Sequence, residues 1–381
     1  MSIEQISSEV VLFFILYGIT GVVPLIAALY LLLRRGNAFA SDVTPPLRLR
    51  RWAASFFAVA ALDHVWWYLF YFYCHDLHSA CYVVVVVLDC VTLLTTMAGT
   101  LLAMFQDRRR PVWPAFAAMV PFVVVGVLQI LFPKTSFSNV ATVYILSIYV
   151  LFFVYMVFAV RQYGRWLNDN YADLENKKVW LSQMVSLASL LLFILYTLVD
   201  VDTLFLLHFF GLVLYALLLW RVETLPQLDS LLPETASALE PTAQEPEPTN
   251  LSSLPSSPLP LIQTVDLAQI EQLLTEHCVN TQLYLQHELS LQQLAQAVGT
   301  NRSYLSQYFS RQGITYNTYI NNLRINYFIS RYQEVVSTQQ PFTVQQLAQE
   351  SGYRSYSTFS LAFKQRMGQT VTTWMRESSV Q

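Results

Sequence analysis

The sequence predicts an all-α protein in which seven apolar helices precede a polar helical domain. Its 381 residues are 54% hydrophobic and 12% charged, with a mean hydropathy of +0.40, outside the usual range of a soluble globular chain. Before residue 222 the apolar residues gather in runs of about 20. In the last quarter the pentapeptide Gln-Gln-Leu-Ala-Gln occurs at 292–296 and again, 53 residues later, at 345–349. These observations divide the chain into a membrane part and a soluble part.

Each of the seven apolar runs can cross a bilayer, because about 20 helical residues rising about 1.5 Å each cover about 30 Å of hydrocarbon. The first run is too long for a signal peptide, follows Glu4 and Glu9 instead of basic residues, and lacks a small-residue cleavage site, so we expect it to be retained. We predict seven transmembrane helices within residues 1–221, at 10–33, 52–73, 81–105, 112–132, 140–160, 179–199 and 204–220.

The basic residues predict how these helices are oriented, since short cytoplasmic loops retain Lys and Arg. Lys134 alone lies in one set of loops, and thirteen Lys and Arg residues lie in the other. This bias places the N-terminus outside and everything after Arg221 in the cytoplasm. We therefore expect a multi-pass protein of the bacterial inner (cytoplasmic) membrane with a cytoplasmic C-terminal domain. The thirteen residues are Arg34, Arg35, Arg48, Arg50, Arg51, Arg108, Arg109, Arg110, Arg161, Arg165, Lys177, Lys178 and Arg221.

Residues 222–262 have the composition of a disordered linker, with eight prolines, six acidic residues and no Lys or Arg. A flexible chain of about 40 residues spans roughly 35 Å on average, so the following domain can stand clear of the lipid surface. Such a linker transmits orientation poorly. We therefore expect any signal to reach the C-terminal domain through its oligomeric state or local concentration.

Residues 263–381 contain two copies of one helical frame. In the first copy Ser290 is the expected N-cap, Gly299 permits a sharp turn, and a second helix starts at Asn301 or Ser303. In the second copy Gly352 makes the turn and Ser355 leads the second helix. The expected core residues are Leu291, Leu294, Ala295, Val298, Leu305 and Phe309 in the first copy, and Val344, Leu347, Ala348, Phe359 and Phe363 in the second. The frame is that of a helix-turn-helix, so the sequence predicts a double helix-turn-helix domain.

Two segments carry a resemblance to a known family. The string from Gly352 to Gly368, Gly-Tyr-Arg-Ser-Tyr-Ser-Thr-Phe-Ser-Leu-Ala-Phe-Lys-Gln-Arg-Met-Gly, resembles the second helix-turn-helix of AraC-type transcription regulators. The string from Tyr319 to Ile325 resembles the helix that joins their two units. The resemblance covers about residues 285–376. It implies a sequence-specific regulator, commonly a homodimer, whose two recognition helices enter successive major grooves of double-stranded DNA.

The resemblance implies which residues meet DNA, because the N-terminal half of a recognition helix faces base edges. Further along each recognition helix, basic residues suit phosphates. Arg324, in the connecting helix, is expected to brace the domain internally. For every other residue the alternative is a solvated helix face. The candidates for base edges are Arg302, Ser303, Tyr304 and Gln307 in the first unit and Arg354, Tyr356, Ser357 and Ser360 in the second, and those for phosphates are Arg311, Lys364 and Arg366.

The charge of the domain is nearly balanced, with eight Lys and Arg against seven Asp and Glu in 263–381, a net of +1. Phosphate neutralisation supplies much of the affinity of DNA-binding proteins. We therefore expect modest affinity from a monomer, increased by dimerisation or by neutral donors to phosphate.

Ionisable residues in the membrane part are Asp63, His64, Asp89 and His208. They are candidates for sensing a small-molecule or lipid-soluble signal, or for structural pairing between helices, because buried charges in a membrane are costly. A retinal protein is excluded, since no predicted transmembrane helix contains a lysine. No nucleotide-binding or protease motif occurs, so we predict no cofactor and no enzymatic activity.

The loop from Cys74 to Cys81 also contains His75 and His78. Six residues between two helix ends in an oxidising compartment favour a disulfide between Cys74 and Cys81 over a metal site, and unpaired thiols are the third alternative.

The leading hypothesis is a membrane-bound transcription regulator whose helices are a sensor for signal transduction or only an anchor. The alternative is a membrane transporter or enzyme with an autoregulatory DNA-binding tail, which would have a polar path through Asp63, Asp89 and His208.

Overall fold

The computed structural model describes residues 8–74, 76, 79–133, 137–174, 177–198, 204–228 and 267–378. In these residues the fold is all-helical, and the β-structure there is a single antiparallel bridge between Tyr171 and Ser290. The chain forms two compact units. The first comprises Met1–Gly164 and Asn176–Asp229, and the second comprises Arg165–Glu175 and Ser230–Gln381.

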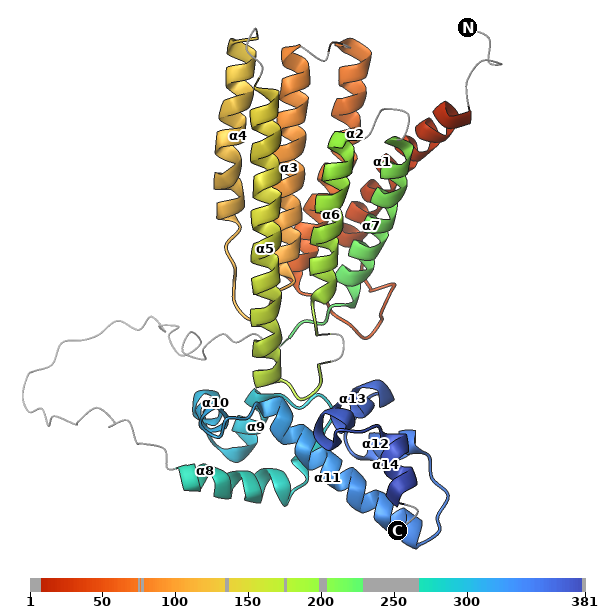
Figure 1. The fold of residues 1–381 in the computed structure, drawn as a ribbon, viewed down its shortest axis with the longest axis vertical. Coiled ribbons are helices and arrows are strands. Elements are labelled where there is room, and N and C mark those ends of the chain that lie inside the picture. Colours follow the sequence, from red (N-terminus) through yellow and green to blue (C-terminus); the bar gives the residue numbers. More distant parts are fainter. Residues whose placement is uncertain are drawn as a thin grey trace, which may run out of the picture. The chain divides into compact units, whose positions relative to one another are not determined.

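The first unit is a bundle of long apolar helices (Figure 1). Five of them, α1 to α5, are long and apolar enough to cross a membrane by length and composition, counted over the described residues. Two further helices, α6 and α7, lie at the other two predicted runs. The bounds are α1 Ser8–Leu33, α2 Leu47–Tyr73, α3 Ala80–Ala103, α4 Trp113–Leu131, α5 Ser138–Asn170, α6 Trp180–Leu198 and α7 Leu204–Thr224.

Three helices extend furthest beyond the apolar runs that predicted them. Helix α2 begins at Leu47 instead of residue 52, α5 continues to Asn170 instead of residue 160, and α7 ends at Thr224 inside the predicted linker. An apolar run ends at the first charged residues, whereas the i to i−4 hydrogen bonds of a helix continue through them. The linker residues from 229 to 262 lie outside the described part of the chain.

The bundle has a tight interior and an apolar exterior. Gly99 of α3 lies under the Trp52 ring, and a Cβ atom at this glycine would be 2.3 Å from the ring. Arg34 and Glu223 form a buried ion pair at 3.1 Å. Large apolar side chains such as Phe14 and Leu151 are 65% and 68% exposed. A soluble protein rarely exposes so much apolar surface, so this exterior suits a lipid environment.

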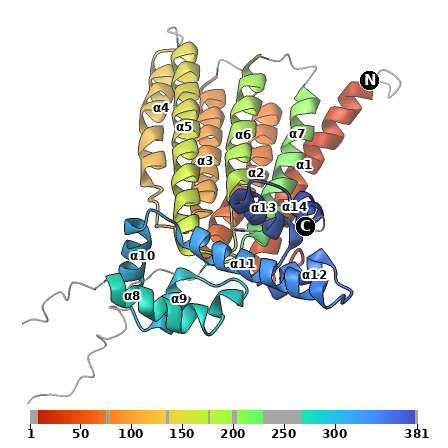
Figure 2. The ribbon, with the colours of Figure 1, turned by 60° about the horizontal axis from the view of Figure 1, so that its bottom comes forward.

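The second unit is arranged along α11 (Tyr316–Ser337), which passes through both of its hydrophobic cores. Figure 2 shows α8 to α10 along one half of α11 and α12 to α14 along the other. Tyr316 and Ile320 belong to the first core, and Ile325 and Phe328 to the second. The other bounds are α8 Leu267–Leu274, α9 Leu291–Val298, α10 Arg302–Arg311, α12 Val344–Glu350, α13 Tyr356–Met367 and α14 Val371–Ser378.

Candidate nucleic-acid interface

The first helix-turn-helix consists of α9 and α10, and its ends are fixed by the expected side chains. Ser290 caps α9 in a capping box, in which its hydroxyl accepts from the Gln293 amide at 3.3 Å and its own amide donates to the Gln293 side chain at 2.8 Å. Gly299 follows with a φ of 72°, a left-handed conformation that favours glycine. Asn301 then caps α10, because its side chain accepts from the Ser303 amide at 2.8 Å.

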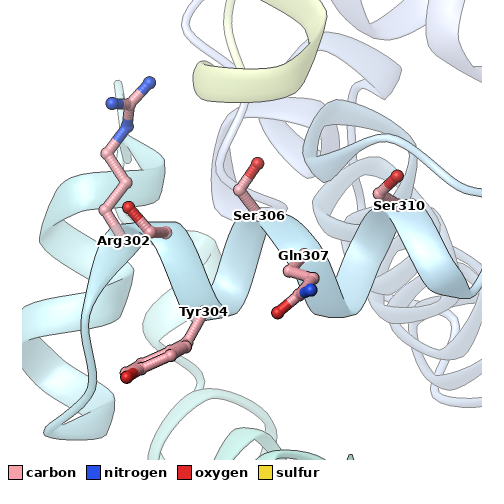
Figure 3. A pocket seen from close by; sticks show the side chains of 6 residues that line it. Arg302, Tyr304, Ser306, Gln307 and Ser310 are labelled. Atoms are coloured by element: carbon pink, nitrogen blue, oxygen red, sulfur yellow. The ribbon is translucent and has the colours of Figure 1, made fainter. Parts of the chain in front are cut away.

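Because one face of α10 is buried, the opposite face is exposed to solvent. Leu305, Tyr308 and Phe309 are buried against α9 and α11. The opposite side is a polar surface beside a shallow hollow of about 540 Å³ (Figure 3). Residues lining this hollow are Arg302, Ser303, Tyr304, Ser306, Gln307 and Ser310.

All four residues predicted to read bases in the first helix-turn-helix line this surface. Ser303 and Gln307 are exposed, and Tyr304 is 38% exposed. Ser306 and Ser310 lie on the same exposed face and were missed by the sequence reasoning. The helical spacing of the buried Leu305 and Phe309 was the signal that could have found them.

Arg302 is the exception among these residues because its guanidinium is already engaged. Its Nε donates to the Asn170 side-chain oxygen at 3.0 Å, and its Nη2 donates to the same oxygen. Desolvation lowers the pKa of Arg302 from its usual value, opposed by nearby Tyr171. Figure 3 shows the Arg302 side chain directed away from those of Tyr304 and Gln307.

The second helix-turn-helix consists of α12 and α13 and repeats the same local chemistry. Thr343 caps α12, Gly352 turns the chain with a φ of 87°, and Ser355 caps α13 by accepting from the Thr358 amide at 3.3 Å. Phe359 and Phe363 are fully buried. The expected caps, turns and core faces of both units are therefore confirmed.

The predicted contact residues of the second helix-turn-helix differ in how far their side chains are exposed. Tyr356 and Ser357 are exposed, Lys364 is exposed further along α13, and Ser360 is half-buried. Exposed Leu361 interrupts this polar surface at 53% exposure.

Two arginines of the second helix-turn-helix that were predicted to contact DNA already have partners in the structure. Arg354 pairs with Glu288 at 2.9 Å on the surface, where such a pair is weak and can exchange for phosphate. Arg366 donates to the Asn322 carbonyl and, at 2.5 Å, to the Asn326 side chain of α11. The structure thus directs Arg366 toward the connecting helix. Arg311, at the end of α10, is exposed.

Arg324 braces the domain internally, as predicted. It is completely buried and donates to the Tyr284 carbonyl at 2.7 Å and the Gln286 carbonyl at 2.8 Å. Its Nη1 forms an ion pair at 3.0 Å with Asp173, from the segment after α5. The partner Asp173 was not foreseen from the sequence.

With this geometry established, comparison with known families decides the kind of domain. Residues 294–377 match the family model described as a helix-turn-helix domain, of the AraC type. Residues 294–377 form an AraC-type helix-turn-helix domain. This AraC-type domain is a DNA-binding domain of transcription regulators and not an enzymatic one. No curated protein and no solved structure matches the chain.

The candidate sensing residues of the first unit lie in two small polar groups. The Thr20 hydroxyl lies 2.9 Å from His64 Nε2 and 3.1 Å from His208 Nδ1. Asp63 accepts from the Trp66 indole at 3.2 Å and lies within side-chain hydrogen-bonding reach of Asp89. The structure therefore brings the four predicted residues into mutual networks, with Thr20 as a partner that the sequence did not reveal.

An apolar cavity of about 370 Å³ lies elsewhere in the first unit, among α3 to α6. Five of the residues that line it carry a hydroxyl group: Thr95, Tyr149, Tyr155, Ser186 and Ser189. This volume falls within the range of small-molecule sites. None of the four candidate sensing residues is among the residues that line it.

Cys74 and Cys81 are free thiols in the structure, so the predicted disulfide is not formed there. A side-chain hydrogen bond with Cys81 is the main cause that raises the pKa of Cys74, which places the two sulfurs close together. The disulfide remains a prediction. His75 and His78 lie outside the described residues. Among the residues that the structure describes, no cluster of metal ligands occurs.

Proposed function

We propose that this protein is a membrane-bound, sequence-specific transcription regulator, with seven helices in the bacterial inner membrane and the AraC-type domain in the cytoplasm. The observation that carries the proposal is the presence of a DNA-binding regulator domain and long apolar helices on one chain. The bias of thirteen basic residues against one supports the orientation, since it puts the domain on the side of the chromosome.

We infer that the exposed faces of α10 and α13 contact DNA. Ser303 and Gln307 supply uncharged donors and acceptors on α10, and Tyr356 and Ser357 do so on α13. Lys364 adds a positively charged donor further along α13. A net domain charge of +1 provides little affinity from phosphates alone. A homodimer on repeated half-sites would double the contacts and compensate for this charge.

The proposal is tested with the full-length chain in lipid nanodiscs and a pool of randomised DNA duplexes. Repeated selection should enrich one sequence family, and genome-wide mapping in cells should find the same family at the occupied sites. A Gln307→Ala chain should enrich it poorly. Failure of the full chain to retain any duplex at low salt would contradict DNA binding.

Whether the helices sense or only anchor is a separate question. The 370 Å³ cavity favours an apolar signal with a hydrogen-bonding group, because its lining is apolar except for a few hydroxyls. Replacing the first unit by an unrelated membrane anchor distinguishes the two roles. Regulation that survives the replacement unchanged would identify an anchor.

The polar networks around Asp63 and His64 keep a second candidate function open, a transporter or membrane enzyme with an autoregulatory tail. This function requires a water-accessible path through these residues. Loss of a transport or turnover activity in Asp63→Asn and Asp89→Asn chains, with DNA occupancy unchanged, would favour it.

A further inference from the structure

The segment that follows the apolar part of α5 is built into the DNA-binding unit. We define residues 165–174 as the docking segment. The Ala172 amide donates to the Leu289 carbonyl at 3.3 Å, and Tyr171 forms the antiparallel bridge with Ser290. Ala172 is 1% exposed and belongs to the same core as Leu294. The docking segment is thus packed into the core of the first helix-turn-helix and does not merely lie on its surface.

The C-terminal half of the docking segment is anchored by charge and by hydrogen bonds. Asp173 Oδ1 pairs with the buried Arg324 guanidinium at 3.0 Å, and Asp173 Oδ2 accepts from the Glu288 amide at 2.9 Å. Arg324 also donates to two neutral carbonyl groups, those of Tyr284 and Gln286. Asn317 of α11 donates to the Ala172 carbonyl at 2.5 Å. A buried guanidinium that loses its carboxylate is strongly destabilising, so this half is a permanent anchor.

Asn170, where α5 ends within the docking segment, makes a different contact. Asn170 is 6% exposed and its Nδ2 donates to the Trp166 carbonyl at 2.6 Å. This bond fixes the amide so that its oxygen faces Arg302, where it accepts from both Nε and Nη2. One edge of the Arg302 guanidinium is therefore occupied. Arg302 itself is only half-buried, so this contact can open without disturbing the Asp173 anchor.

We propose that the contact between Asn170 and Arg302 is an autoinhibitory switch within the DNA-binding unit. While Asn170 holds the guanidinium, the Nε and Nη2 donors of Arg302 are engaged and cannot contact DNA, and the chain binds DNA weakly. When the contact opens, the same guanidinium edge becomes free for a base or a phosphate. Because Asn170 is the last residue of α5, whose apolar part belongs to the first unit, a change in that helix can act on Arg302 without passing through the predicted linker, residues 222–262. This inference rests on the proposed DNA binding.

The test compares the DNA affinities of full-length chains in nanodiscs. The randomised pool is selected separately with the parent chain and with the Asn170→Ala chain, and the duplex that both selections enrich is used for every measurement. Asn170→Ala should bind on the order of tenfold more tightly, the factor that one charge-assisted hydrogen bond corresponds to. Asn168→Ala, a residue of the same type two positions earlier, is the matched control and should bind like the parent.

A double-variant chain separates the switch from a general change in folding. In an Arg302→Ala background, Asn170→Ala should have no effect on affinity, because no guanidinium remains to be released. Equal affinities of the parent and Asn170→Ala chains would overturn the switch while leaving DNA binding intact. A persistent gain in the Arg302→Ala background would overturn it as well. If neither the parent nor the Asn170→Ala chain retains DNA, the proposed function itself fails, which is a distinguishable result.

Discussion

Gly352→Ala is the substitution for which the structure gives the sharpest expectation. Gly352 forms the turn between α12 and α13 and has a φ of 87°. A Cβ atom there would lie 2.7 Å from the Leu285 carbonyl oxygen, 2.9 Å from Leu285 Cα and 3.0 Å from Arg324 Nε. Two of these three atoms belong to the backbone and the third to a buried guanidinium, so none can move aside cheaply. The turn of the second helix-turn-helix is therefore packed directly against the segment before the first.

The expected loss of stability has two parts. An L-residue in the left-handed region costs about 1–2 kcal/mol. Forcing a methyl group into a packed site costs about 1–3 kcal/mol more. Gly368→Ala is the matched control, since Gly368 has a φ of 73° and no atom within 4 Å of an added Cβ. The control should lose only the first part, so the two chains should differ by about 1–3 kcal/mol in the free energy of unfolding.

Pulse proteolysis over a urea series measures this difference in the full-length chain, with a C-terminal epitope tag that reports the second unit alone. The midpoint for Gly352→Ala should lie clearly below that for Gly368→Ala at an unchanged slope. Gly299→Ala, another position with a positive φ and open space, should behave like the control. Equal midpoints for Gly352→Ala and Gly368→Ala would show that an added Cβ at residue 352 meets no close contact with Leu285.

Three further predictions follow from the described residues. Gln307→Ala should weaken binding to the selected duplex about tenfold in an anisotropy titration, because an amide on the exposed face of α10 is lost, whereas Gln349→Ala on the supporting helix should change it little. The Cys278 thiol is buried and desolvation raises its pKa to about 12, so it stays protonated until strongly alkaline pH and should resist iodoacetamide at neutral pH. In the same sample, reduced beforehand so that no disulfide holds Cys81, the exposed Cys81 should react, as read by peptide mass spectrometry. Thr20→Val removes the hydroxyl between two histidines and should lower the thermal midpoint of the full chain in detergent; an unchanged midpoint would mean that this network does not stabilise the bundle.

Local chemistry explains why much of the AraC-type domain could be predicted from the sequence. Ser290, Asn301 and Ser355 are N-caps because a short polar side chain satisfies amides a few residues ahead. Gly299 and Gly352 are turns because only a residue without a Cβ adopts a positive φ at little cost. Each of these rules needs only a few neighbouring residues, and all of them appear in the sequence.

The partners of Arg302 and Arg324 could not be predicted in this way. Asn170 and Asp173 are separated from them by 132 and 151 residues. Composition gave no reason to connect a loop between two apolar helices with a domain beyond a proline-rich linker. The length of α5 was also underestimated, because hydropathy detects the apolar part of a helix and α5 continues for ten polar and mixed residues past it. Contacts between distant segments depend on the tertiary fold, which periodicity does not encode.

The docking segment also changes which physical route is available for signalling. A flexible linker of about 40 residues keeps a domain nearby but transmits almost no orientation. The second unit, however, is assembled from two stretches of the chain, 165–175 and 230–381. Its buried Arg324 depends on a carboxylate from the first stretch, so residues 263–381 expressed alone would lack a counter-ion for a completely buried charge. A chain beginning at residue 263 should therefore be less stable than the full protein, even though it contains both recognition helices. Adding a peptide of residues 165–174 to that chain should restore part of the loss, and an Asp173→Asn peptide should restore less, which would identify the docking segment as a structural part of the DNA-binding unit.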